Sequence, residues 1–213
     1  MAFEDVEPVR RFGWSKGQSH FAGWWWSATT GRHVAYESWL ERDHAMLLDF
    51  DPDVVAIASQ PFWLCWSDGA RARRHAPDFF VRRADGVGVV IDVRADDRIE
   101  SADEEAFEAT GRACAEVGWD FRRLGVPAPV MTGNVRWLSR YRHPRCAGRP
   151  ELASALRQAC EKPRPLFEVA SEIGERIAVL PVLFHLMWRR VLVADLGGEP
   201  LHAASMVTAS VPE

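Results

Sequence analysis

Short stretches in which hydrophobic and polar residues alternate make up much of the first part of the chain, and segments with helical spacing separate them. Alternation with aromatic and β-branched residues is typical of half-buried strands, whereas apolar positions three or four residues apart predict an amphipathic helix. The predicted strands are two around a turn within residues 20–36, then residues 54–57, 59–66, 77–83, 87–94, 119–124 and 129–132. The predicted helices are residues 37–49, residues 102–117 and a segment capped by Asn134 that runs through Arg140.

The order of these elements predicts the α/β class, with a mixed sheet covered by helices on both faces. The composition changes at residues 142–150, a basic stretch rich in Pro and Gly that indicates a linker. After the linker the pattern predicts helices at residues 151–160, 165–173 and 178–189 and a hairpin within residues 191–208. We therefore expect two domains, residues 1–145 with the mixed sheet and residues 150–213 with the three helices and closing hairpin of a winged-helix domain.

The composition is that of a globular protein with a sizeable core. The 213 residues are 47% hydrophobic and 26% charged, and no apolar run is long enough for a membrane helix. The acidic N-terminus does not resemble a signal peptide, and the four cysteines are scattered without a CxxC pair, which favours free thiols in a reducing compartment. We therefore expect a cytoplasmic protein with no membrane partner.

The net charge of −4 does not by itself indicate a nucleic-acid partner. Basic residues are nevertheless concentrated on both sides of Asp78. They are Arg71, Arg73, Arg74, Arg82 and Arg83. Because a guanidinium group binds phosphate through two parallel hydrogen bonds, we expect these arginines to hold phosphate groups near Asp78.

Two aspartates carry the candidate chemistry. Asp78 follows His-Ala-Pro and precedes Phe-Phe-Val, and Asp92 lies inside Val-Ile-Asp-Val-Arg94. On adjacent strands their carboxylates would face one point, which suits Mg²⁺ or Mn²⁺, because such ions take a few carboxylates and keep several waters. This is the layout of a divalent-metal phosphodiesterase site of the PD-(D/E)xK kind, with Arg94 in place of lysine. The two motifs by themselves also allow a purely structural interpretation, in which one Asp closes a turn and the other lies on a solvated strand face.

Several motifs occur in a fixed order along the chain. They are Tyr36-Glu-Ser-Trp-Leu-Glu41-Arg-Asp, Leu48-Asp-Phe-Asp-Pro-Asp-Val, Gln60-Pro61, Pro77-Asp78-Phe and Ile91-Asp92-Val-Arg94. In this order the chain resembles, over nearly its whole length, the TnsA-like endonuclease subunits of heteromeric transposases. The resemblance implies a restriction-endonuclease-like nuclease domain that carries the metal site, followed by a small winged-helix domain.

The resemblance also implies roles for individual residues. Glu41 takes the position of the helix-borne catalytic glutamate, Asp78 that of the central metal-binding aspartate, and Asp92 that of the second strand acid. Arg94 takes the position usually held by lysine. The expected catalytic residues are therefore Glu41, Asp78, Asp92 and Arg94, and the expected metal ligands are Asp78, Asp92 and Glu41, the last directly or through water.

Each of these residues has an alternative interpretation. Glu41 could pair with a neighbouring arginine on a solvated helix, and we assign Glu37 rather than Glu41 to the structure of the helix start. Arg94 stays protonated and cannot act as a general base, so it either holds the scissile phosphate or forms a salt bridge to Asp92 or Asp96. His75 is interpreted as a structural histidine rather than a DNA or metal contact.

Two functions follow as hypotheses. The first is a Mg²⁺- or Mn²⁺-dependent endonuclease that, as the resemblance implies, nicks one strand at the 5′ ends of a transposon, with a DDE-type transposase subunit and an AAA+ ATPase regulator as partners. The second is a catalytically silent TnsA-like assembly module that binds DNA ends or the transposase through its winged-helix domain. Loss of the lysine favours the second hypothesis, and retention of three acids in register favours the first.

Overall fold

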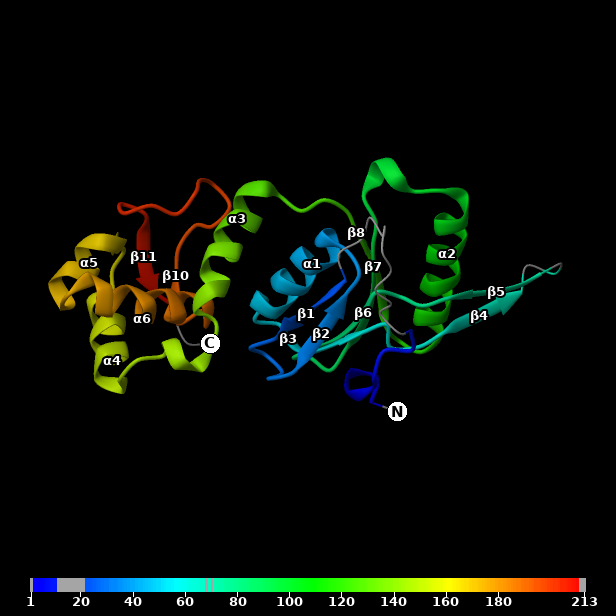
Figure 1. Ribbon diagram of the computed structural model, residues 1–213, viewed down its shortest axis with the longest axis horizontal. Coiled ribbons are helices and arrows are strands. Elements are labelled where there is room, and N and C mark those ends of the chain that lie inside the picture. Colours follow the sequence, from blue (N-terminus) through cyan, green and yellow to red (C-terminus); the bar gives the residue numbers. More distant parts are fainter. Residues whose placement is uncertain (1, 11–21, 68, 70, 211–213) are drawn as a thin grey trace. The chain divides into compact units, whose positions relative to one another are not determined.

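The computed structural model describes residues 2–10, 22–67, 69 and 71–210, and the chain forms two compact units, residues 1–127 and 128–213 (Figure 1). Residues 20 and 21 of the first predicted hairpin lie outside the described residues. The domain bounds predicted from the sequence, 1–145 and 150–213, remain a prediction about which segments fold by themselves. No helix in the described ranges is long and apolar enough to cross a membrane.

The N-terminal unit is built on a four-stranded sheet. Its strands, in spatial order, are β3 (Val54–Ser59), β6 (Phe79–Arg83), β7 (Gly88–Val93) and β8 (Asp120–Leu124). The β3–β6 and β6–β7 pairs are antiparallel, and β8 runs parallel to β7. The expectation of a mixed α/β core is therefore confirmed, and the arrangement fits a restriction-endonuclease-like fold.

Alternation along the central strands builds two cores, one on each face of this sheet. Phe79 and Ile91 belong to the core that contains Ala45 of helix α1 (Trp39–Phe50). Their neighbours in sequence belong to the other core with Cys114 of helix α2 (Ser101–Glu116). These neighbours are Phe80 and Val90. Because both faces are covered, the central strands are buried along most of their length.

Two hairpins extend this unit, and one of them was not predicted. They are β1 (Gly23–Trp26) with β2 (His33–Tyr36), and β4 (Leu64–Ser67) with β5 (Ala72–His75). The single strand predicted at residues 59–66 is wrong, because β3 continues through Ser59 and the chain then turns at Gln60, whose φ is +43°. Pro61 follows, and only after it does β4 begin.

The C-terminal unit combines helices with a small antiparallel sheet of order β10-β11-β9. Its elements are α3 (Pro129–Leu138), α4 (Pro150–Ala159), β9 (Arg164–Pro165), α5 (Leu166–Ile173), α6 (Arg176–Trp188), β10 (Leu192–Val193) and β11 (Met206–Ala209). Short 3-10 turns occur in the N-terminal unit at Phe3–Asp5 and Asp96–Arg98, and in the C-terminal unit at Ser139–Tyr141 and Pro144–Cys146. The three helices predicted after the linker are present, each within a few residues of its expected bounds.

The strand predicted at residues 129–132 is wrong, because α3 begins at Pro129. Proline suits the first position of a helix, since its fixed φ is already helical and its missing N–H would have no helical partner there. Asn134 is inside α3 and is not a cap. Its buried amide donates to the carbonyl oxygens of Leu196 and Glu199 and accepts from the Leu201 N–H. The polar side chain therefore fastens the loop before β11 to α3.

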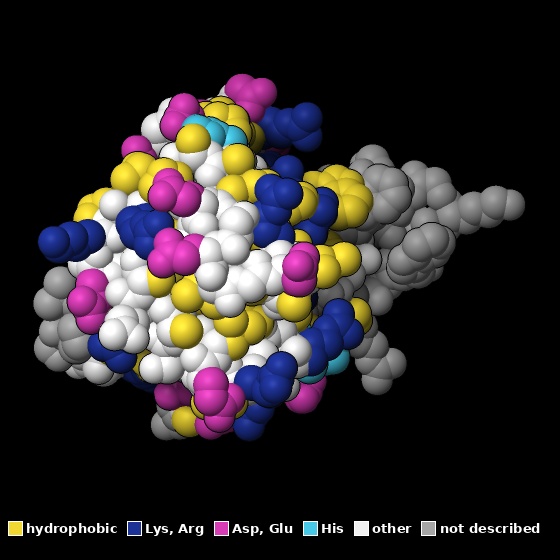
Figure 2. Space-filling view, turned by 90° about the vertical axis from the view of Figure 1, so that its left-hand side faces the viewer, with side chains coloured by type: hydrophobic (Ala, Val, Ile, Leu, Met, Phe, Trp, Pro, Cys, Tyr) yellow, Lys and Arg dark blue, Asp and Glu magenta, His cyan; other side chains and the backbone are white. Residues whose placement is uncertain are grey.

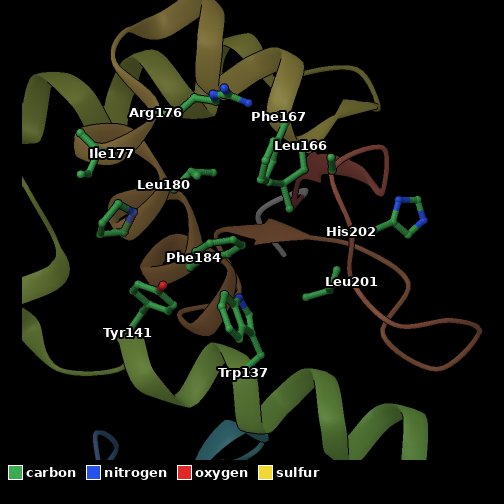
Figure 3. Close-up of a pocket in the computed structure, with 12 residues that line it drawn as sticks. Trp137, Tyr141, Leu166, Phe167, Arg176, Ile177, Leu180, Phe184, Leu201 and His202 are labelled. Carbon is green, nitrogen blue, oxygen red and sulfur yellow. The ribbon is translucent and has the colours of Figure 1, made fainter.

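Helix α6 is apolar on all sides, and most of its residues from Val182 to Trp188 are buried. A pocket of about 350 Å³ lies beside it, lined largely by apolar side chains, several of them aromatic (Figure 3). The rings of Trp137, Tyr141 and Phe184 contact one another there. The pocket contains none of the residues to which the sequence assigned chemistry.

Candidate functional site

Asp78 and Asp92 lie opposite each other on adjacent strands. Phe79 pairs with Ile91, so the next position outward on each strand brings Asp78 beside Asp92. The Asp92 side chain is 3% exposed, which is rare for a carboxylate without a partner charge or metal. Oδ2 of Asp78 accepts a hydrogen bond of 2.7 Å from the Val93 N–H, so the backbone of β7 fixes this carboxyl group.

Asp78 is affected by two other carboxylates at this end of the sheet. Burial raises the pKa of Asp78 well above its ordinary value, and repulsion by Glu41 and then Asp92 adds to the effect. Burial also raises the pKa of Glu41, although the hydrogen bonds that it accepts oppose the shift. A cluster of this kind favours either bound protons or a cation that neutralises the negative charge.

Asp92 combines one satisfied oxygen with one that has no partner. Its Oδ1 lies 2.9 Å from Nε2 of His75, at the end of β5. Its Oδ2 is buried and, among the residues that the structure describes, has no hydrogen-bond partner. A buried carboxylate oxygen without a protein partner is costly, and this oxygen is available to bind a cation. His75 was interpreted as structural from the sequence, and its only signal was its place three residues before Asp78.

Glu41 has a structural role at the start of helix α1, and the local sequence contains the signal for it. The predicted helix at residues 37–49 begins two residues later, at Trp39, with Ser38 as its N-cap. The Ser38 hydroxyl accepts from the Glu41 N–H, and Glu41 accepts from the Ser38 hydroxyl at 2.8 Å and from the Glu37 N–H at 2.7 Å. This is the Ser-x-x-Glu capping pattern. Glu41 therefore also holds the helix start, while Glu37 forms an ion pair with Arg10 at 3.2 Å.

The structure places the Arg94 guanidinium on Asp103, at the start of α2. Its Nε and a terminal nitrogen lie 3.1 and 2.9 Å from Oδ2 of Asp103, and Nε also donates to the Arg98 carbonyl oxygen at 3.0 Å. As the alternative to phosphate binding, the sequence led us to expect a salt bridge from Arg94 to Asp92 or Asp96. In the structure the partner is Asp103, and Asp96 pairs with Arg123. The Arg94 side chain is 41% exposed, so this ion pair contributes at most about 1 kcal/mol and a phosphate can replace it at little cost.

The arrangement fits a hard divalent ion. The described residues hold no group of three or more His, Cys, Asp or Glu side chains arranged to bind a metal ion. Mg²⁺ does not require such a group, because one or two carboxylates, waters and phosphate oxygens complete its octahedral shell. The Oδ2 of Asp92, which has no partner among the described residues, and the fixed carboxyl group of Asp78 are of the ligand type that such an ion takes.

The mixed sheet covered by helices fits the restriction-endonuclease-like class of folds. Residues 51–124 match the family described as TnsA-like endonuclease N terminal, and over these residues the resemblance stated from the motifs is confirmed. The matched segment includes Asp78, Asp92 and Arg94, whereas Glu41 and the C-terminal unit lie outside it. No curated protein matches the chain.

Proposed function

We propose that this protein is the endonuclease subunit of a heteromeric transposase and that it nicks DNA at transposon ends by phosphodiester hydrolysis. The observation that carries the proposal is the pair Asp78 and Asp92, on adjacent strands, with one buried oxygen of Asp92 left without a described partner. The family match supports a nuclease function over the same segment. Mg²⁺ or Mn²⁺ is the proposed cofactor, held by Asp78 and Asp92 and, directly or through water, by Glu41.

When bound, such an ion activates a water molecule and neutralises charge on the phosphate. The residues of the chain keep the ligands in place. The Val93 N–H fixes the Asp78 carboxyl group, and His75 fixes the rotation of the Asp92 carboxyl group. Arg94 leaves Asp103 and donates to a non-bridging oxygen of the scissile phosphate, where a positive charge stabilises the transition state.

The C-terminal unit is proposed to be a winged-helix domain. Support comes from the order α4, β9, α5, α6, β10, β11, in which three helices are combined with a three-stranded antiparallel sheet. Because α6 is largely buried, it is not suited to insert into a DNA groove as a recognition helix. On the face of this unit seen in Figure 2, basic and acidic side chains are interspersed, with hydrophobic side chains between them. We therefore propose that the unit binds protein partners, namely a DDE-type transposase subunit and an AAA+ ATPase, in the cytoplasm.

The silent assembly module is the second candidate, and two specific contacts favour it. The Arg94 guanidinium is held by Asp103, and both carboxylate oxygens of Glu41 accept hydrogen bonds at the helix start. Retention of all three acids argues against this candidate, because a protein that no longer binds metal would gain stability by losing one of three acids that repel one another.

Metal-dependent thermal stabilisation tests the proposed site. With millimolar Mn²⁺ the melting temperature of the full chain should rise, because the ion binds only the native state. Asp78→Asn should abolish this rise, and Asp97→Asn, a change of an exposed acid in the turn before α2, should leave it unchanged. In the same samples, wild type with the transposase partner should nick DNA that contains transposon ends. An equal rise in Asp78→Asn and wild type would remove the metal from this location.

A further inference from the structure

Hairpin β4–β5 extends from the sheet past α2, and its two faces have different surroundings (Figure 1). In its register Leu64 pairs with His75, and Trp66 pairs with Arg73. Side chains that are directly opposite share a face, so these four residues form one face, which we name the inner face. All four are partly buried.

The inner face fastens the hairpin to the rest of the N-terminal unit. Trp66 donates from its indole N–H to one oxygen of Glu105 in α2 at 3.1 Å, and the Arg73 guanidinium lies 3.3 Å from the other oxygen. At the base of the hairpin His75 contacts Asp92. The hairpin is therefore held at a defined position relative to the carboxylates.

The other face, which we name the outer face, is exposed. Its residues are Trp63, Cys65, Ser67, Ala72 and Arg74. The Arg74 guanidinium stacks on the Trp63 ring, 4.6 Å from its centroid, and this ring is 39% exposed. The side chains of Cys65, Ser67 and Ala72 are small, and the five described residues of this face include an arginine and no acid.

We propose that the outer face of hairpin β4–β5 binds a groove of duplex DNA beside the phosphodiester that is cleaved, with Arg74 and Trp63 as its main contacts. This inference rests on the proposed nuclease function. A two-stranded ribbon fits the major groove, which is about 12 Å wide, and strands of this length span about 13 Å. The positive charge complements DNA phosphates, and small side chains let the backbone approach the groove.

The position of the hairpin along the chain supports the same partner. Strand β5 ends at His75, three residues before Asp78, and His75 contacts Asp92. The base of the hairpin therefore lies beside the two acids, and a duplex that follows the ribbon to its base comes close to them. Arg71 precedes β5 and extends the basic sequence toward the far end of the ribbon.

Fluorescence anisotropy with the full chain tests this proposal. The probe is a labelled duplex of about 30 base pairs in EDTA, titrated at several salt concentrations so that the salt slope is measured. Arg74→Glu should weaken binding at least about tenfold and reduce the slope of log K against log salt by about 1 or more. Trp63→Ala should weaken binding about three- to tenfold through lost stacking and packing.

Arg112→Glu is the matched control, since Arg112 is an exposed arginine of the same unit, on α2. It should change the affinity by no more than about twofold, the size of a remote charge effect in screened solution. Equal weakening by Arg74→Glu and Arg112→Glu would overturn the proposal, as would a wild-type chain that does not bind the duplex. Unchanged melting temperatures and Mn²⁺ responses show that the variants are folded with an intact metal site.

The two proposals fail in different ways. If wild type binds the duplex and Arg74→Glu does not, but no metal supports cleavage, the nuclease function fails and the DNA-binding face remains. If wild type cleaves DNA and Arg74→Glu cleaves it with the same KM, the nuclease function stands and the outer face has no role in DNA binding.

Discussion

Asp49 should be the most sensitive polar position for the stability of the N-terminal unit. It lies in the last turn of α1, where a negative charge opposes the helix dipole, and it is only 4% exposed. Its carboxylate accepts four hydrogen bonds of 2.7 to 3.0 Å from the β1–β2 hairpin and its turn. The donors are the Trp25 indole, the Ser27 hydroxyl and the N–H groups of Ala28 and Thr29.

The size of the effect follows from these bonds. Hydrogen bonds to a charged group contribute about 1.5–3 kcal/mol each, which gives an upper sum of about 6–12 kcal/mol for Asp49→Ala. Only the bond from Ser27 is fully buried, and water can replace part of the others. We therefore expect a loss of about 3–5 kcal/mol, the range for the loss of one partner from a buried charged network. Asp49→Asn should cost about 2–3 kcal/mol, because its amide nitrogen faces donors.

Urea denaturation, followed by fluorescence of the tryptophans, measures these losses as shifts of the transition midpoint. Asp53→Ala is the control, because Asp53 is an exposed acid in the turn that follows α1, and it should change the free energy of unfolding by less than about 0.5 kcal/mol. If Asp49→Ala is within about 1 kcal/mol of wild type at an unchanged m-value, the four bonds do not hold the hairpin and the reasoning is wrong.

Two further predictions concern the site. The native-state pKa of Asp78 lies above its ordinary value of 3.8, so the folded protein binds a proton that the unfolded chain releases. The free energy of unfolding in EDTA should therefore fall as the pH rises above the ordinary value of 3.8 toward the raised native-state pKa. It should fall less in Asp78→Asn, and parallel plots of the free energy of unfolding against pH for the two proteins would contradict this. Arg94→Ala should reduce nicking at least about a hundredfold, because a positioned cation stabilises the transition state, while Arg94→Lys keeps activity and both change stability by less than about 1 kcal/mol. If wild type does not nick DNA and Arg94→Lys does, the protein is a disabled nuclease.

The sequence determined those features that depend on neighbouring residues or on strand alternation. Asp78 and Asp92 could be placed together because Asp78 directly precedes one apolar strand, Asp92 lies in the next, and the hairpin signal between the strands sets their register. The Ser-x-x-Glu pattern at Ser38 contains enough local information to predict the capping role of Glu41. The capping pattern and the hairpin turn between the two strands depend on residues a few positions apart, and strand alternation has a period of two. These features can therefore be predicted from short stretches of sequence.

Only the tertiary structure decided which distant groups meet these residues. His75 contacts Asp92 from 17 positions away because Gln60 turns the chain and a separate hairpin returns to the sheet. Arg94 has several acids within reach along the chain, and the position of α2 on the sheet selects Asp103. A long side chain can reach several partners of similar chemistry, so its contact depends on how whole elements pack and not on the residues beside it.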